Sequence, residues 1–367
     1  MRKKKRGYDK LTKIFLIRHA EAEGNLYRRM HGHYNGLVTS KGHVQMDLLK
    51  KRLKKEKIDA VYSSDLKRAA ETSEAIYVPR NLEPILSEQL REVDMGVWED
   101  SPWGYSDYYE PAMSKNFSHD PEKWQIEGGE DYYNVRRRMH DYITQAAKNH
   151  DGGAIAVVSH GFSIRAFICQ LKGIQSHEVH KLPYCDNTAV TLLHYENGKF
   201  DIEYYGDAAH LEIHMRTLEN QSWWRDRKHR RNENARFEKF DEIRDKEIID
   251  IIADDIGFPP QSDEMYTAFQ EEIPGGLLGI NTSSGDDEKI GKVEYLFVRP
   301  ESRRTTIGVQ ILGQAVSIFR KMGKEKLQME VRKGSPAFNF CKKYGFKTVN
   351  QKRGSYCLME KDLWSWK

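Results

Sequence analysis

The sequence lacks several features that mark secreted, membrane-bound or zinc-stabilised proteins. Its four cysteines, Cys169, Cys185, Cys341 and Cys357, are scattered and include no closely spaced CxxC pair, so we expect neither a disulfide scaffold nor a structural zinc site. No apolar run approaches the roughly 18 residues that a membrane-spanning helix needs. These absences favour a reducing compartment, and we expect a cytoplasmic protein without a membrane partner.

Net charge is also small, at +4 over 367 residues, so no field of the whole protein attracts polyanions. Two local basic segments, residues 1–10 and the cluster at 225–231 beside Trp223 and Trp224, have the composition of a nucleic-acid contact. We favour a solvated tail for the first segment and a solvated inter-domain helix anchored by the tryptophans for the second, and we expect no nucleic-acid partner. The apolar run after the basic tail, "IFLI", is too short for a signal peptide.

Length alone predicts two or three domains. From residue 11 to about 213, short apolar runs alternate with amphipathic helical patterns, which predicts an α/β domain with a mostly parallel sheet. The apolar runs are "KIFLIR" (13–18), "IDAVYSS" (58–64) and "GAIAVVSH" (153–160). "AVTLLHYENGKFDIEYYG" (189–206) contains the turn signal Glu196-Asn197-Gly198 and predicts a hairpin.

After residue 213 the composition and the pattern of predicted elements change twice, and we find no internal repeat. Residues 214–234 form a charge-dense linker, and apolar positions from Phe237 to Ile252 predict one or two amphipathic helices. The last hundred residues predict an α+β domain, so that we divide the chain into a tail, two domains and a linker: 1–10, 11–213, 214–234 and 235–367. Its expected strands are 275–284, 289–298, 326–331 and 354–363, and its expected helices are 306–323 and 336–345.

Two apolar runs of the first domain end in a histidine, His19 and His160. Strand ends of a parallel sheet border one crevice, so these histidines are expected to lie together. Arg68 falls in the first turn of a predicted helix, for which Ser64 or Asp65 is a suitable N-cap.

Together with Arg18 and Glu92, these residues suit phosphoryl transfer. Arginines bind phosphate oxygens, a neutral imidazole attacks phosphorus, and a carboxyl group protonates the leaving oxygen.

Five segments in order, "LIRHAEAEGN", "SSDLKRAAETSEAI", "LREVDMGVWE", "EGGE" and "VVSHGFSIR", resemble the histidine phosphatase superfamily in its phosphoglycerate-mutase-like branch. The resemblance covers roughly residues 11–213 and implies a three-layer α/β/α fold. It implies a phosphohistidine at His19, with Glu92 as proton donor. It also implies phosphate or substrate contacts from Arg18, Asn25, Arg29, Arg68, His160 and Gly161, and no metal or other cofactor.

The chain departs from that family's usual pattern at the substrate rim. Ala22 stands where a threonine is common, and Asn35-Gly36 replaces an aspartate-x-proline. The usual arginine-x-glutamine-glycine appears as Arg29-Met30-His31-Gly32. His31 and His33 have a metal-like spacing, but without a third ligand we favour a rim role. These departures affect the expected specificity more than the chemistry.

Phosphatases and phosphomutases need the same residues and differ in whether water is admitted. We expect a phosphatase that acts on a small phosphorylated metabolite, with a phosphomutase as the alternative. Residues 98–133, rich in tryptophan and tyrosine, are expected to form the lid over the site. Their aromatic rings suit either an amphipathic substrate or internal packing.

A second site is expected where "VEYLFVRPESRRTTIGVQIL" passes from a strand through a basic loop into a helix. With "PAFNFCKKYGF" downstream, residues 235–367 resemble the GNAT acyltransferase fold. The resemblance implies acetyl-CoA as cofactor, an amine acceptor, and cofactor contacts from Val298, Arg303, Arg304, Thr305, Thr306, Ile307 and Gly308.

The resemblance is incomplete at the residues that carry acyl transfer. Thr306 replaces the first loop glycine, and Cys341 occupies the position of a frequent proton-donating tyrosine. Tyr344 lies one helical turn later, and Glu294 is a candidate general base. A catalytic acetyltransferase and a non-catalytic CoA-sensing or scaffold module therefore both stay open, as does a homo-oligomer.

Overall fold

A computed structural model describes residues 10–219, 233–256, 259–282, 288–303, 305–351 and 355–366. The basic tail at 1–9, the cluster at 225–231 with Trp223 and Trp224, and Arg304 lie outside these residues. The described chain divides into two compact units, of which unit 1 comprises 10–22, 31–99 and 111–219. Unit 2 comprises 23–30, 100–110 and the described residues from 233 onward. No helix within these ranges has both the length and the apolar character needed to cross a bilayer.

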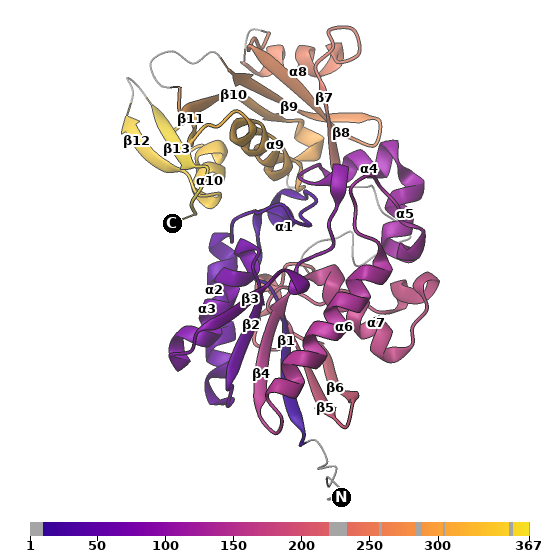
Figure 1. Cartoon of the computed structure of the whole chain (residues 1–367). Helices are drawn as coiled ribbons and strands as arrows, with labels where there is room; N and C mark the ends of the chain where they lie inside the picture. The colour runs from indigo at the N-terminus through magenta and orange to yellow at the C-terminus, as the bar shows by residue number, and fades with distance from the viewer. Residues whose placement is uncertain are drawn as a thin grey trace, which may run out of the picture. The chain divides into compact units, whose positions relative to one another are not determined.

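Unit 1 is built on a six-stranded sheet with strand order β3-β2-β4-β1-β5-β6 (Figure 1). The first four strands in that order are parallel, and β5 and β6 are antiparallel to their neighbours. The strands are β1 Thr12–Arg18, β2 Ala60–Ser64, β3 Pro84–Ser87, β4 Ala154–Ser159, β5 Val190–Glu196 and β6 Lys199–Asp207.

Helices cover both faces of this sheet, which makes the three-layer α/β/α fold expected from the sequence (Figure 1). Helices α2 and α3 pack together on one face, and α6 and α7 on the other. Apolar side chains such as Phe15, Val61 and Ile76 form a buried core between the sheet and its helices. The helices of unit 1 are α2 Ser40–Arg52, α3 Lys67–Tyr77, α5 Pro111–His119, α6 Tyr132–Asn149 and α7 Gly161–Lys172.

Two local predictions for unit 1 have different outcomes. The hairpin is confirmed, because Asn197 and Gly198 both have positive φ, of 52° and 80°, as a type I′ turn requires. The cap of α3 is not Ser64 or Asp65: Leu66 holds that position, and the side chain of Asn35 accepts from the Lys67 amide at 3.0 Å. A residue 32 positions earlier in the chain thus satisfies an amide that the local sequence leaves open.

Unit 2 contains a seven-stranded sheet with strand order β12-β13-β11-β10-β9-β8-β7. The predicted strands and helices of the last hundred residues are present, and β7, β8 and β12 were not predicted. The strands are β7 Ala235–Lys239, β8 Glu264–Gln270, β9 Ile273–Asn281, β10 Ile290–Val298, β11 Lys326–Arg332, β12 Lys347–Gln351 and β13 Tyr356–Asp362. The helices are α1 Glu23–Tyr27, α4 Trp103–Tyr109, α8 Lys246–Ile256, α9 Ile307–Lys321 and α10 Pro336–Lys343.

The helical prediction for Phe237 to Ile252 is correct only in its second half. Phe237 lies in β7, and Ile243 is 91% exposed in the loop before α8. Ile248 and Ile252 are buried and, with Leu277, form the small core beneath α8. The predicted helix was too long, because apolar residues of a strand, a loop and a helix follow one another in this segment and together resemble one helical pattern.

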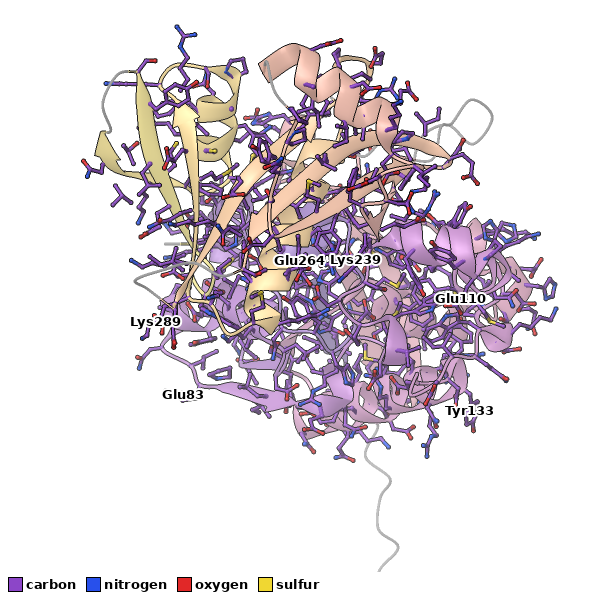
Figure 2. The ribbon with its side chains drawn as sticks, turned by 90° about the horizontal axis from the view of Figure 1, so that it is seen from above. Glu83, Glu110, Tyr133, Lys239, Glu264 and Lys289 are labelled. Atoms are coloured by element: carbon purple, nitrogen blue, oxygen red, sulfur yellow. The ribbon has the colours of Figure 1, made fainter. Side chains whose placement is uncertain are left out.

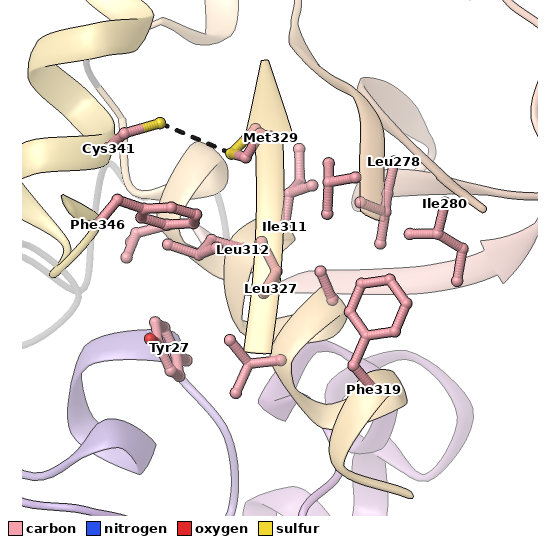
Figure 3. Close-up of a cluster of buried hydrophobic side chains, with 14 of the residues drawn as sticks. Tyr27, Leu278, Ile280, Ile311, Leu312, Phe319, Leu327, Met329, Cys341 and Phe346 are labelled. Carbon is pink, nitrogen blue, oxygen red and sulfur yellow. Dashed lines mark hydrogen bonds between the residues drawn. The ribbon is translucent and has the colours of Figure 1, made fainter. Parts of the chain in front are cut away.

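The core of unit 2 includes a side chain from the N-terminal half of the sequence. Tyr27 of α1 is buried with Leu312 and other apolar residues of α9 and the sheet (Figure 3). A Cβ atom on Gly313 would lie 2.4 Å from the Tyr27 Cβ, so α1 approaches α9 closely only because that residue is glycine. Residues 23–30 therefore belong to the second unit by packing, although they continue the sequence of the first domain.

A buried ion pair completes this part of unit 2. Arg29 Nε donates to Asp100 Oδ1 at 2.8 Å, and its other nitrogens donate to Gln314 at 2.8 Å and Ser317 at 3.0 Å. Ser317 Oγ also donates to Asp100 Oδ2. Burial opposes ionisation of Asp100, but the neighbouring Arg29 guanidinium prevails and lowers the pKa of that carboxyl group. All three guanidinium nitrogens of Arg29 have protein partners, so we revise its expected role from substrate contact to structural ion pair.

Charged side chains cover the outside of both units, as the 31% charged composition implies. Figure 2 shows Glu83 in unit 1 and Lys239 and Lys289 in unit 2 at such positions.

We predict that Asp100→Ala destabilises unit 2 by about 3–5 kcal/mol, because it leaves the Arg29 charge buried without its counter-charge. Amide hydrogen exchange of α9, read by mass spectrometry, reports on unit 2 alone. Lys289→Ala is the matched control, since its partner Glu325 is 53% exposed and their ion pair contributes less than about 1 kcal/mol. Equal protection of α9 in the two variants would contradict the prediction.

Candidate active site

The register of two parallel strands brings His19 and His160 together. Arg18 of β1 pairs with Ser159 of β4, and each histidine is the next residue of its chain segment. The His19 amide donates to the Ser159 carbonyl at 2.9 Å, and the two imidazole centroids lie 5.1 Å apart. The proximity expected from the sequence therefore follows directly from sheet geometry.

The imidazole of His19 is held in a nucleophilic orientation. Its Nδ1 lies 2.7 Å from the Ala20 carbonyl, a contact that requires a proton on Nδ1 and leaves the lone pair on Nε2. Burial, and then the charges of Arg68 and Arg18, hold the pKa of His19 well below its usual value. His19 is therefore a neutral imidazole at neutral pH, the form that can attack phosphorus.

Arg18 lies against the start of α7. Its Nη1 donates to the Cys185 carbonyl at 2.6 Å. A Cβ atom on Gly161, the first residue of α7, would lie 3.2 Å from Arg18 Nε and 3.3 Å from its Cζ. Gly161 thus provides the space that the guanidinium occupies.

Arg68, in the first turn of α3, is fully buried and bonded to one loop. Its Nη1 donates to the Tyr34 carbonyl at 3.0 Å, and its Nη2 to the His31 and Gly32 carbonyls at 2.8 Å each. Burial lowers the pKa of Arg68 to about 10, although Glu92 and Glu99 act in the opposite direction. The guanidinium is still protonated at neutral pH.

Several buried nitrogens around His19 have no hydrogen-bond partner among the described residues. Such atoms are costly unless a ligand or water satisfies them. They belong to two cationic and two imidazole side chains: Arg18 Nε, Arg68 Nε, His31 Nδ1, and both ring nitrogens of His160. Two guanidinium N–H groups and two imidazoles, each able to donate an N–H, are suited to binding a phosphate dianion.

Glu92 is fixed at the N-terminus of α7. Its Oε1 accepts from the Ser163 amide at 2.9 Å, the Ser163 hydroxyl at 3.0 Å and the Val93 amide at 3.1 Å. Its Oε2 accepts from the Phe162 amide at 3.0 Å. Oε2 has the fewer donors and is therefore the oxygen better able to carry a proton.

The structure brings five of the expected residues, Arg18, His19, Arg68, Glu92 and His160, into this part of unit 1, with Gly161 beside them. Asn25 and Arg29 belong to unit 2. His31 was expected only at the substrate rim, and Asn187 and the Cys185 carbonyl were not predicted as members of the site. Asn187 Nδ2 donates to the His19 carbonyl at 2.8 Å, and such backbone contacts leave no pattern in the sequence.

Two tryptophans of the expected lid, Trp98 and Trp124, pack inside unit 1. Trp98 and Trp124 are 1% and 2% exposed, and their rings lie 5.9 Å apart. Phe117 stacks on Phe162 of α7 at 4.8 Å. Of the two interpretations of these aromatics, the structure supports internal packing for Trp98 and Trp124.

The second expected site lies in unit 2, where β10 ends and α9 begins. β10 and β11 pair only from Ile290 to Val293 with Lys326 to Met329, although the strands continue to Val298 and Arg332. The sheet therefore opens beside the N-terminus of α9. Gly308 lies at that helix start, where a Cβ atom would contact Val298 at 3.4 Å and Phe340 at 3.5 Å.

Thr306 does not strain the loop before α9. Its φ is −87°, so this backbone does not need the positive φ that only glycine adopts easily. The Thr305 hydroxyl accepts from the Ile307 amide at 3.3 Å, and Arg303 Nε donates to the Val298 carbonyl at 3.1 Å. An open sheet followed by a helix N-terminus fits a CoA pyrophosphate.

The three candidate residues for acyl transfer differ in how exposed they are to solvent. Cys341 is fully buried, its thiol donates to Met329 Sδ, and burial raises its pKa to about 12 (Figure 3). It is therefore unsuited to proton transfer. Tyr344 is half-buried beside Phe340, with ring centroids 4.7 Å apart. Glu294 is the unpaired residue of a β-bulge in β10 and accepts from Ser262 at 2.8 Å.

Comparison with known proteins supports the assignment of both domains to the families that the sequence resembles. Residues 14–208 match the model of the histidine phosphatase superfamily (branch 1), and residues 221–346 match that of the acetyltransferase (GNAT) family. The chain is 30% identical to phosphoserine phosphatase 1 of Hydrogenobacter thermophilus over 189 residues, which are 52% of this chain and 89% of that protein. It is 28% identical to the probable phosphoglycerate mutase GpmB of Yersinia pestis, over 55% of this chain and 96% of that protein.

Solved structures resemble the same half of the chain. Bacillus stearothermophilus YhfR aligns with a TM-score of 0.53 and 29% identity, covering 55% of this chain and 100% of that one. A phosphoserine phosphatase from Entamoeba histolytica, in complex with 3-phosphoglyceric acid, aligns with a TM-score of 0.50 and 25% identity. That match covers 55% of this chain and 100% of the other.

Proposed function

Because the chain belongs to the histidine phosphatase superfamily over residues 14–208 and carries a GNAT acetyltransferase domain, we propose that its first domain hydrolyses small phosphomonoesters through a phosphohistidine at His19. One observation carries the proposal. A buried, neutral His19 lies among Arg18, Arg68 and His160, and within the described chain the Nε atoms of both arginines and both ring nitrogens of His160 have no hydrogen-bond partner. That arrangement suits a phosphate dianion next to a nucleophile.

In the first step, His19 Nε2 forms a bond to phosphorus and the bond from phosphorus to the ester oxygen breaks. The leaving alkoxide takes a proton from Glu92, for which we assign Oε2. Arg18 and Arg68 stabilise the charge on the transferred phosphoryl oxygens. The Ala20 carbonyl keeps the single N–H proton of the neutral imidazole on Nδ1, so that phosphorylation at Nε2 yields a well-oriented imidazolium.

In the second step, a water oxygen attacks phosphorus as the nitrogen–phosphorus bond breaks. His19 keeps the electron pair and returns to its neutral form, and the water proton goes to the Glu92 carboxylate. A phosphomutase would instead pass the phosphoryl group to a second hydroxyl of the substrate. The names of the phosphoserine phosphatases among the relatives support hydrolysis, and that of the probable phosphoglycerate mutase supports the alternative.

We expect His19→Ala to lower kcat/KM for phosphomonoester hydrolysis by at least about 1,000-fold, because the covalent step is lost. Release of inorganic phosphate over a panel that includes phosphoserine and 3-phosphoglycerate measures it. His43→Ala, a half-exposed histidine of α2, is the control and should keep full activity. Full activity of His19→Ala would exclude the mechanism, and transfer to a second hydroxyl without phosphate release would favour the mutase.

For the second domain we propose binding of acetyl-CoA at the start of α9, with acyl transfer to an amine. The support is the opening between β10 and β11 beside the α9 N-terminus. When bound, the cofactor would supply the thioester, and Tyr344 and Glu294 are the candidates for moving protons. Proximity of amine and thioester provides much of the rate in such reactions.

We expect Gly308→Asp to weaken acetyl-CoA binding at least tenfold, since a carboxylate would then face the cofactor phosphates. The change should not unfold α9, because an acidic residue stabilises a helix N-terminus. Calorimetric titration with acetyl-CoA measures the affinity. Val349→Asp, which adds the same charge at a 54% exposed position of β12, is the control. Absence of binding to the unmodified protein would contradict the proposal, and binding without thiol release over an amine panel would favour a CoA-sensing module.

A further inference from the structure

His31 is a third histidine at the candidate active site. Its ring centroid lies 5.7 Å from that of His19, and the two rings are nearly perpendicular, at 89°. The related family usually has glutamine at this position, so the substitution places a titratable group beside the nucleophile. From the sequence, His31 was expected only as a residue of the substrate rim.

The backbone around His31 is held rigidly. The His31 and Gly32 carbonyls both accept from Arg68 Nη2. A Cβ atom on Gly32 would lie 2.2 Å from the Val93 carbonyl oxygen, so only glycine fits there. Glu99 accepts from the amides of His33 at 2.6 Å and Tyr34 at 2.9 Å. The backbone position of His31 is therefore fixed by the loop.

The imidazole of His31 has an unused nitrogen. Its Nδ1 is buried and has no hydrogen-bond partner among the described residues. Arg18, His19, Arg68 and His160 are charged or titratable groups whose charges interact with the His31 ring. Burial, and then Arg68 and Arg18, hold the pKa of His31 well below its usual value, so the ring is neutral before an anion binds.

A metal does not explain this arrangement. Across the described parts of the chain, no group of three or more histidine, cysteine, aspartate or glutamate side chains could hold a metal ion. An anion explains it better, because a dianion next to the ring reverses the electrostatic balance that keeps the ring neutral.

We propose that His31 is part of the phosphoryl site and binds the phosphoryl oxygens as an imidazolium, taking up a proton from solvent as the anion arrives. The inference rests on the proposed phosphatase function. The proton forms a new N–H bond on the ring, no other bond changes, and the proton is released when phosphate leaves. Glutamine at this position binds an anion without proton uptake, so His31 makes anion affinity in this protein depend on pH.

The probe is inorganic sulfate, a dianion that does not titrate between pH 5 and pH 8, so that any proton taken up belongs to the protein. Calorimetric titration of the full chain at pH 6.5, in buffers of different ionisation enthalpy, counts the protons. We expect uptake by the unmodified protein, and clearly less uptake by His31→Gln together with about tenfold weaker binding at low pH. His43→Gln is the matched control, and thermal melting of each variant verifies folding.

Kinetics provide the second readout. The value of kcat/KM for p-nitrophenyl phosphate should rise toward acidic pH more steeply in the unmodified protein than in His31→Gln. Sulfate binding without proton uptake, or with equal uptake in His31→Gln, would overturn the role of His31 and leave the phosphatase proposal intact. Absence of both sulfate binding and hydrolysis in the unmodified protein would overturn the proposed function itself.

Discussion

The burial of two guanidinium groups beside His19 is the constraint on which the first domain depends. Removing a charge from water costs several kcal/mol unless nearby groups compensate. For Arg68 the compensation comes from three loop carbonyls and from the charges of Glu92 and Glu99. For Arg18 it comes from the Cys185 carbonyl. Burial, and then the same charges, keep the neighbouring imidazoles neutral, so the features that make the site costly also prepare it for an anion and a nucleophile.

Much of this site could be predicted because it follows from the ends of parallel strands. His19 and His160 end apolar runs, and sheet geometry alone brings them together. The contacts that fix them could not be predicted in this way. Asn35 caps α3 from a distant loop, and Cys185 acts through its backbone oxygen, so neither role depends on a recognisable side-chain pattern. His31 was visible in the sequence, but the backbone that carries it is held by Arg68 contacts that no sequence pattern shows.

The second domain shows where periodicity fails. Its main helix and four strands were predicted, whereas Phe237 was assigned to a helix and lies in β7. The packing of residues 23–30 into the second unit could not be predicted at all, since it depends on the absence of a side chain at Gly313. Cys341, named as a candidate for acyl transfer from its place in the family pattern, is a core residue bonded to Met329. Whether such a residue is catalytic or part of the core depends on its burial, and burial is set by tertiary packing that the sequence pattern does not show.

The central claim is that the phosphoryl group passes through His19. Its most direct test is rapid acid-free quenching of the enzyme during turnover of a phosphomonoester, followed by proteolysis at alkaline pH and mass spectrometry of the peptide that contains residues 14–28. The account predicts a phosphoryl group on His19 that survives alkali and is lost in acid. A phosphoryl group on another residue, or active turnover with His19 unmodified at every quench time, would contradict it.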